Sequence, residues 1–175
     1  MKTFLSLIAL AAGLSVAGAQ DFIANLTGAQ DGGGARIGSG IFNLTLTGTT
    51  MTLSGSYSGL SAPATAGHIH GPGAPGVSVG VIYNLAGSGN LTIGATSGTL
   101  SGTVDLVPLA GGSYTVASQI ADLNNGLWYF NVHDANFPGG EIRGQILPVP
   151  EPSTLALAGL GLGGLMVWRL RRRKD

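Results

Sequence analysis

The chain has 175 residues, of which 31 are glycine, only 9% are charged and none is cysteine. Five of the eight lysines and arginines lie in the last seven residues, so residues 20–147 hold six acids against two arginines, a formal net charge of −4. Phosphate binding needs basic residues, which excludes nucleic acid as a partner of this central segment, and without cysteine no disulfide or thiolate-bound metal stabilises it.

Residues 1–19 predict a secretory signal peptide. Lys2 supplies a positive charge, an apolar stretch runs from Phe4 to Val16, and Ala17-Gly18-Ala19 forms a small-residue cleavage site. A membrane-spanning helix is the alternative, but the apolar run is short and ends in the small-residue pattern. We therefore expect this segment to be removed on export.

Residues 20–147 are long enough for one domain with its own core. Apolar residues alternate with hydroxyl or amide residues in segments 42–47, 50–54, 77–81, 99–106 and 142–146. This period of two predicts half-buried strands, and the glycine-rich and proline-glycine stretches between them predict turns. Gly48-Thr49 is a gap of hairpin length, and residues 116–123 are the one segment for which a short helix is predicted. The pattern predicts an all-β domain, a β-sandwich or Greek-key barrel of about eight or nine strands.

The three histidines fall in two short segments, 67–72 and 127–134. On a strand, His68 and His70 point to the same face, about 6.6 Å apart along the chain. His133 shares a face with Asn131 in the second segment. If the two segments pair, three imidazoles and the carboxylate of Glu141 converge.

The same two segments carry a resemblance to a known family. The chain resembles the CHRD domain in three motifs: His68-Ile69-His70-Gly71-Pro72, Trp128-Tyr129-Phe130-Asn131-Val132-His133 and Phe137-Pro138-Gly139-Gly140-Glu141-Ile142-Arg143-Gly144-Gln145. The resemblance covers roughly residues 22–146. It implies an immunoglobulin-like β-sandwich in an extracellular context, and it brings no established activity.

Two interpretations of the histidine segments remain open. Three neutral imidazoles on rigid strands suit zinc or copper, with Glu141 or Asp134 as an additional ligand. A His-x-His strand also resembles copper-zinc superoxide dismutases, which would imply a redox module. The alternative is structural and needs no cofactor. In it the imidazoles bond to the backbone and to Glu141, within a polar cluster that includes Asn131, Asp134 and Arg143. Arg143 and Glu141 would share another face, with Arg143 paired to a carboxylate.

Motifs for catalysis are missing. No Gly-x-Ser-x-Gly elbow is predicted on a strand-to-helix turn, and only Asp134 and Glu141 are neighbouring carboxylates of the kind that glycoside hydrolysis needs. We therefore expect a non-catalytic binding or structural module. A third class, carbohydrate binding, would use exposed asparagine, threonine and aromatic residues near Trp128.

Residues 148–175 have the order of a sorting signal rather than of a folded segment. Pro150-Glu151-Pro152 is followed by an apolar run from Leu155 to Trp168, which as a helix spans roughly 21 Å against a bilayer core of about 30 Å. A cluster of basic residues follows, which would keep this end of the helix on the cytoplasmic side of the membrane. The cluster consists of Arg169, Arg171, Arg172, Arg173 and Lys174. A permanent membrane anchor is the simpler alternative.

This segment resembles the PEP-CTERM sorting signal of Gram-negative bacteria. The resemblance implies recognition by an exosortase, cleavage near the Pro-Glu-Pro triplet and transient anchoring in the inner membrane through a hydrophobic helix. The destination that it implies is the cell surface or an extracellular polysaccharide matrix. We expect an exosortase as partner, and matrix polysaccharide or surface proteins as further partners.

Overall fold

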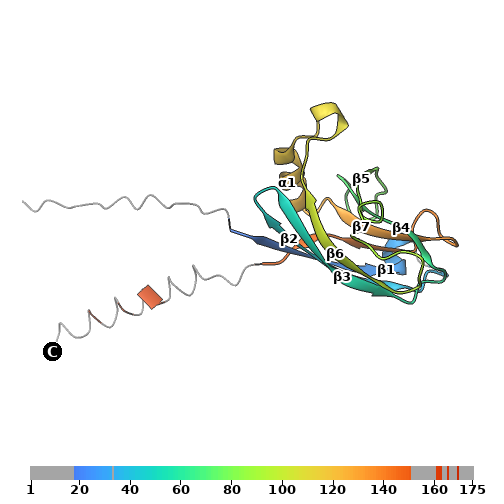
Figure 1. Ribbon diagram of the computed structural model, residues 1–175. Coiled ribbons are helices and arrows are strands. Elements are labelled where there is room, and N and C mark those ends of the chain that lie inside the picture. Colours follow the sequence, from blue (N-terminus) through green and yellow to red (C-terminus); the bar gives the residue numbers. More distant parts are fainter. Residues whose placement is uncertain (1–17, 33, 151–160, 163–164, 166–168, 170–175) are drawn as a thin grey trace, which may run out of the picture.

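The computed structural model describes residues 18–32, 34–150, 161, 162, 165 and 169 (Figure 1). The predicted signal peptide lies outside the described residues apart from Gly18 and Ala19. The sorting segment beyond Pro150 lies outside them too, apart from four residues. No helix within the described part of the chain is both long and apolar enough to cross a bilayer.

The described chain is built mainly from antiparallel strands. In chain order the elements are β1 (Gln20–Thr27), the 3-10 helix η1 (Gly28–Asp31), β2 (Ser39–Thr47), β3 (Thr50–Ser58), β4 (Ala64–His70), β5 (Val81–Asn84), β6 (Gly98–Asp105), the 3-10 helix η2 (Ala110–Gly112), α1 (Val116–Asn124), β7 (Tyr129–Asp134), β8 (Ile142–Gln145) and β9 (Leu147–Pro148). The strand order is β5-β4-β7-β8-β1-β2-β3-β6, with β9 beside β1. The prediction of an all-β fold with eight or nine strands is confirmed.

The sheet curls so that its two halves face each other across the core (Figure 1). The predicted alternation explains which side chains point inward: on β2, Phe42, Leu44 and Leu46 are buried, whereas Asn43 between them is exposed. Phe42 meets Phe130 of β7 edge to face, with ring centroids 5.2 Å apart. This aromatic pair joins the β1-β2-β3-β6 half to the β5-β4-β7-β8 half.

Two local predictions are confirmed. Strands β2 and β3 form a hairpin in which Thr47 pairs with Thr50, around the glycine-containing gap that the sequence indicated. The predicted helix forms as α1 and is capped by Thr115, whose hydroxyl accepts a hydrogen bond from the backbone N–H of Ser118 at 3.2 Å. This contact is a regular N-cap.

The prediction of a strand over residues 77–81 is wrong. β5 begins only at Val81, and residues 71–80 form a loop instead. The carbonyl of Val77 accepts a hydrogen bond from Arg143 at 2.8 Å, and that of Val79 lies 2.8 Å from Nδ1 of His70. Side chains on β4 and β8 therefore bond to carbonyls that in a strand would accept hydrogen bonds from a neighbouring strand. These contacts hold the loop over the face of the sheet opposite the core.

Candidate functional site

The site is built where β4 and β7 pair. Their antiparallel register places His68 opposite Asn131 and His70 opposite Tyr129. Residues directly opposite each other point to the same face of a sheet, so His68, His70 and His133 share one face. The predicted pairing of the two histidine segments is confirmed.

This face points away from the core. Ile69 and Phe130, which alternate with the site residues, are both 0% exposed in the hydrophobic core between the sheet halves. The histidines therefore lie on the outer face of β4 and β7. There His70 and His133 are buried, whereas His68 is partly exposed.

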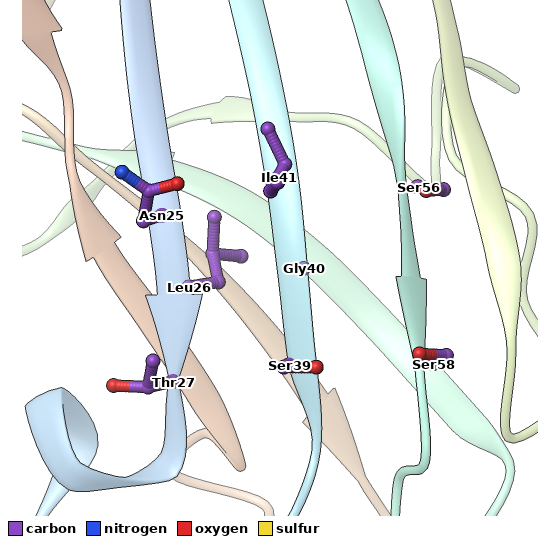
Figure 2. Close-up of a pocket in the computed structure, with 8 residues that line it drawn as sticks. All are labelled: Asn25, Leu26, Thr27, Ser39, Gly40, Ile41, Ser56 and Ser58. Atoms are coloured by element: carbon purple, nitrogen blue, oxygen red, sulfur yellow. The ribbon is translucent and has the colours of Figure 1, made fainter.

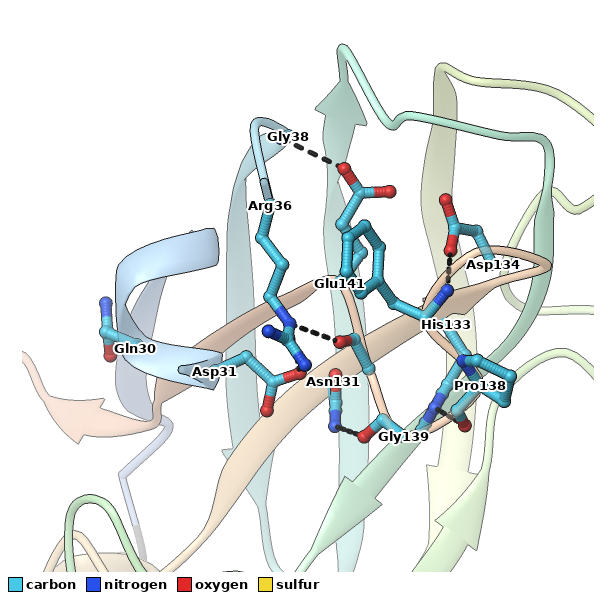
Figure 3. A network of polar contacts seen from close by, with 12 residues as sticks. Gln30, Asp31, Arg36, Gly38, Asn131, His133, Asp134, Pro138, Gly139 and Glu141 are labelled. Atoms are coloured by element: carbon cyan, nitrogen blue, oxygen red, sulfur yellow. Dashed lines mark hydrogen bonds and ion pairs between the residues drawn. The ribbon is translucent and has the colours of Figure 1, made fainter. Parts of the chain in front are cut away.

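Backbone carbonyls orient two of the three imidazoles. Nδ1 of His70 lies 2.8 Å from the carbonyl of Val79, and Nδ1 of His133 lies 2.9 Å from the carbonyl of Pro138 (Figure 3). A carbonyl only accepts, so both Nδ1 atoms carry the proton and donate, and each Nε2 keeps its lone pair. Nδ1 of His68 approaches Nε2 of His133 at 2.9 Å, and one ring nitrogen from each histidine lies within 4.8 Å of the others.

One nitrogen in this group has no partner. Nε2 of His70 is buried and makes no hydrogen bond, although the residue is only 7% exposed. Buried polar atoms in folded proteins nearly always have a partner. A buried lone pair without a partner is a nitrogen that is available to bind a cation.

Tyr129 fixes the orientation of His70. The two rings stack at a centroid distance of 4.7 Å and an angle of 3°. The guanidinium of Arg143 lies 3.4 Å from the centroid of the same tyrosine ring, a cation–π contact. Because β7 lies between β4 and β8, the tyrosine ring is flanked by a histidine from one neighbouring strand and by an arginine from the other.

The surroundings of Arg143 differ from the expected ones. Its register on β8 places it opposite Asn131, on the histidine face rather than on another face. Its described partners are the Tyr129 ring and the carbonyl of Val77 rather than a carboxylate. The sequence does not show which residues of β7 and β8 lie opposite each other. This register places Arg143 on the histidine face, so its position could not be predicted.

Glu141 is the one predicted ligand that the structure places elsewhere. It is 0% exposed, and both carboxylate oxygens lie 2.9 Å from the backbone N–H of Ser61, with a longer bond of 3.4 Å from the N–H of Gly38 (Figure 3). Asp134 lies nearby and accepts hydrogen bonds from the Ser61 hydroxyl at 2.9 Å and from the N–H of Phe137 at 2.6 Å. These carboxylates hold loop backbone together, and the histidine group forms without them.

Asp31 also belongs to this region, and sequence reasoning did not predict it. Its carboxylate lies 3.8 Å from Arg36, which donates to the carbonyl of Gly140 at 3.0 Å. Gly140 has a φ of +126°, and a Cβ there would come within 2.4 Å of both Asp31 and Asn131. Burial raises the pKa of the Asp31 carboxyl, although Arg36 and then Arg143 act against it. Asp31 is more than a hundred residues from the loop that it contacts, so no short motif in the sequence linked the two.

The acid titration of His68 is the first testable consequence. Burial, followed by the proximity of His133 and His70, lowers the pKa of His68 to about 4. Between pH 6.5 and 4 the unfolded chain binds a proton here that the folded chain does not, so this contribution to stability is complete above pH 6.5 and is lost as the pH falls toward 4. Imidazole NMR shifts of the metal-free protein should show His68 neutral at pH 5.5. A midpoint near 6.5 would contradict this environment.

A hollow on the surface lies away from these titratable groups. It has a volume of about 380 Å³ and lies over β1, β2 and β3 (Figure 2). Its lining consists of Asn25, Leu26, Thr27, Ser39, Gly40, Ile41, Ser56 and Ser58. None of these side chains titrates near neutral pH, so the hollow offers no group for acid–base catalysis.

Comparison with known families covers both parts of the chain. The CHRD domain model matches residues 22–146, and the PEP-CTERM protein-sorting motif matches residues 148–173. No curated protein and no solved structure matches the chain. The domain match spans β1 to β8, including the histidine face, and the motif match begins in β9.

Proposed function

The chain belongs to the CHRD domain family and ends in a PEP-CTERM sorting motif, and on this premise we propose that it is a non-catalytic module of the cell surface or extracellular matrix. The motif marks an exported protein that an exosortase processes. The host that we propose is a Gram-negative bacterium. There the apolar segment would anchor the chain transiently in the inner membrane before cleavage.

The position of the motif relative to the fold carries this proposal. β9 pairs with β1, and the N–H of Val149 donates to the carbonyl of Asp21 at 2.8 Å. The Pro-Glu-Pro triplet begins at the next residue, Pro150. Cleavage near the triplet would therefore release the β-sandwich with every described strand intact.

A non-catalytic role agrees with how the buried acids are used. Asp134 and Glu141 are 1% and 0% exposed, and their oxygens accept hydrogen bonds from loop backbone. A general acid or base must reach a substrate proton, and these two groups face protein. The pair that the sequence offered for glycoside hydrolysis therefore supports loop structure in this proposal.

Binding of matrix polysaccharide cannot use Trp128 itself. Trp128 is 0% exposed and donates to the hydroxyl of Tyr114 at 2.9 Å, so its ring is no stacking platform for sugars. The outer face of β2, β3 and β6 instead presents rows of uncharged polar side chains: Asn43, Ser54 and Ser101 in one row, and Thr45, Thr52 and Thr103 in the next. Such rows favour a neutral, hydroxyl-rich partner.

The sorting step has a direct test. Replacing Pro150, Glu151 and Pro152 together by alanine should abolish processing, so that the chain stays in the membrane fraction and disappears from the surface and the medium. Immunoblots of fractionated cells measure this distribution. Ser153→Ala, beside the triplet, is the matched control and should be processed like the parent. Release of the triple variant at the parental level would overturn the proposal.

A further inference from the structure

We propose that His68, His70 and His133 bind a single Zn²⁺ or Cu²⁺ ion, through Nδ1 of His68 and Nε2 of the other two. This goes beyond a passive surface module, because it assigns a binding site with a defined donor set. The sequence contains no other histidine and no cysteine. An imidazole-bound metal therefore has to use these three rings.

The hydrogen-bond pattern is that of metal-ligating histidines. In such sites the imidazole donates its second N–H to a carbonyl or carboxylate, which fixes the tautomer and directs the free nitrogen at the ion. His70 and His133 do this with the carbonyls of Val79 and Pro138. Both carbonyls belong to loops that follow the histidine strands, so the fold itself sets the tautomers.

The unpartnered nitrogen supports the same assignment. Nε2 of His70 belongs to a residue that is 7% exposed, and it has no hydrogen-bond partner. An ion bound by the three rings gives this lone pair a partner. Stacking on Tyr129 at an angle of 3° holds the His70 ring in place, so this ligand is positioned before the ion arrives.

The distances require one small adjustment. Metal–nitrogen bonds of about 2.1 Å in a tetrahedral arrangement separate the nitrogens by roughly 3.4 Å. The nitrogens here are 2.9 Å apart for His68 and His133, and all lie within 4.8 Å. His68 is partly exposed, and the one hydrogen bond described for its side chain is the contact with His133. Rotation of its side chain, with the ring proton moved from Nδ1 to Nε2, opens the short contact and frees the Nδ1 lone pair without disturbing the other two rings.

The donor set selects the metal. Imidazole suits zinc and copper, whereas magnesium and calcium prefer oxygen ligands. Among the described residues no carboxylate and no thiolate joins the group. Three protein nitrogens leave a fourth position for water, as in open zinc sites. The partial exposure of His68 gives the ion a path to this position from solvent.

The test uses the chain with its C-terminal segment, exported by a host without an exosortase so that only the signal peptide is removed, then purified in detergent and stripped with a chelator. Zn²⁺ or Cu²⁺ is then titrated by calorimetry, and bound metal is counted by elemental mass spectrometry. We expect about one equivalent per chain, with a Cu²⁺ EPR spectrum that shows coupling to nitrogen. His68→Ala should lower the affinity by about 100-fold or more, since even residues behind the ligands contribute 10- to 100-fold.

Controls separate this site from adventitious binding and from loss of the fold. Asp105→Asn removes an exposed carboxylate on β6 and should leave the affinity unchanged. His70→Gln tests the buried ligand, and if that variant does not fold, His68→Ala decides, because its position is partly exposed. Absence of bound metal in the parent, or equal affinity in a folded His68→Ala variant, would overturn the site. Neither result affects the sorting experiment, which stands on other residues.

Discussion

Replacing Glu141 by alanine is expected to lower the free energy of unfolding by about 3 kcal/mol or more, because each buried donor left without its acceptor costs roughly 1 to 3 kcal/mol. The carboxylate accepts hydrogen bonds from the backbone N–H groups of Ser61, Gly38 and Ile37 and from the Ser61 hydroxyl. These groups belong to the segments before β2 and after β3. One side chain therefore ties two connections to the start of β8. Urea unfolding followed by fluorescence measures the change.

The matched variants separate charge from hydrogen bonding. Glu141→Gln keeps one acceptor oxygen and should lose less stability than the alanine variant, whereas the exposed Asp105→Asn should change it by less than about 0.5 kcal/mol. Equal stabilities of Glu141→Ala and the parent would mean that water replaces the carboxylate. The account of these two connections would then be wrong.

Replacing Phe130 by alanine is expected to cost about 3 to 5 kcal/mol, the usual range for removing a buried aromatic ring. Phe130 is 0% exposed, and its ring packs edge to face against Phe42 from the opposite half of the sheet. Loss of the ring leaves a cavity where the two halves meet. Chemical denaturation of the variant and the parent, with equal slopes, measures the difference.

Ile41 provides the control for this experiment. It neighbours Phe42 on β2 but points outward and is 53% exposed. Ile41→Ala should therefore change stability by less than about 0.5 kcal/mol. A loss at Phe130 no larger than the loss at Ile41 would contradict the position of the core between the two sheet halves.

Period-two patterning predicted much of the fold because the inward and outward faces differ sharply in polarity. The β2–β3 hairpin was predicted from its alternation and glycine turn, and α1 was the one helix expected. The same rule failed over residues 77–81. Alternation there accompanies a loop whose carbonyls at Val77 and Val79 pair with Arg143 and His70. Periodicity carries no information on such side-chain partners.

The histidine group was predictable in part. Alternation placed His68 and His70 on one face, and pairing of the two segments brings His133 to them. Glu141 was expected beside the histidines because pairing of the two segments was expected to bring its carboxylate to them. The turn at residues 138–140 directs it toward Ser61 instead. The sequence does not show which way a side chain points after a turn. No motif marked Ser61, which is distant in the chain, as the partner of Glu141.

The measurement that tests the account most directly is the intact mass of the chain recovered from the surface or medium of its host. The account predicts a protein that begins near Gln20 and ends near Pro150, because the sandwich closes at Val149 and the Pro-Glu-Pro triplet of the sorting motif follows at once. A mass that extends to Asp175 would contradict exosortase processing. The C-terminal segment would then be a permanent anchor.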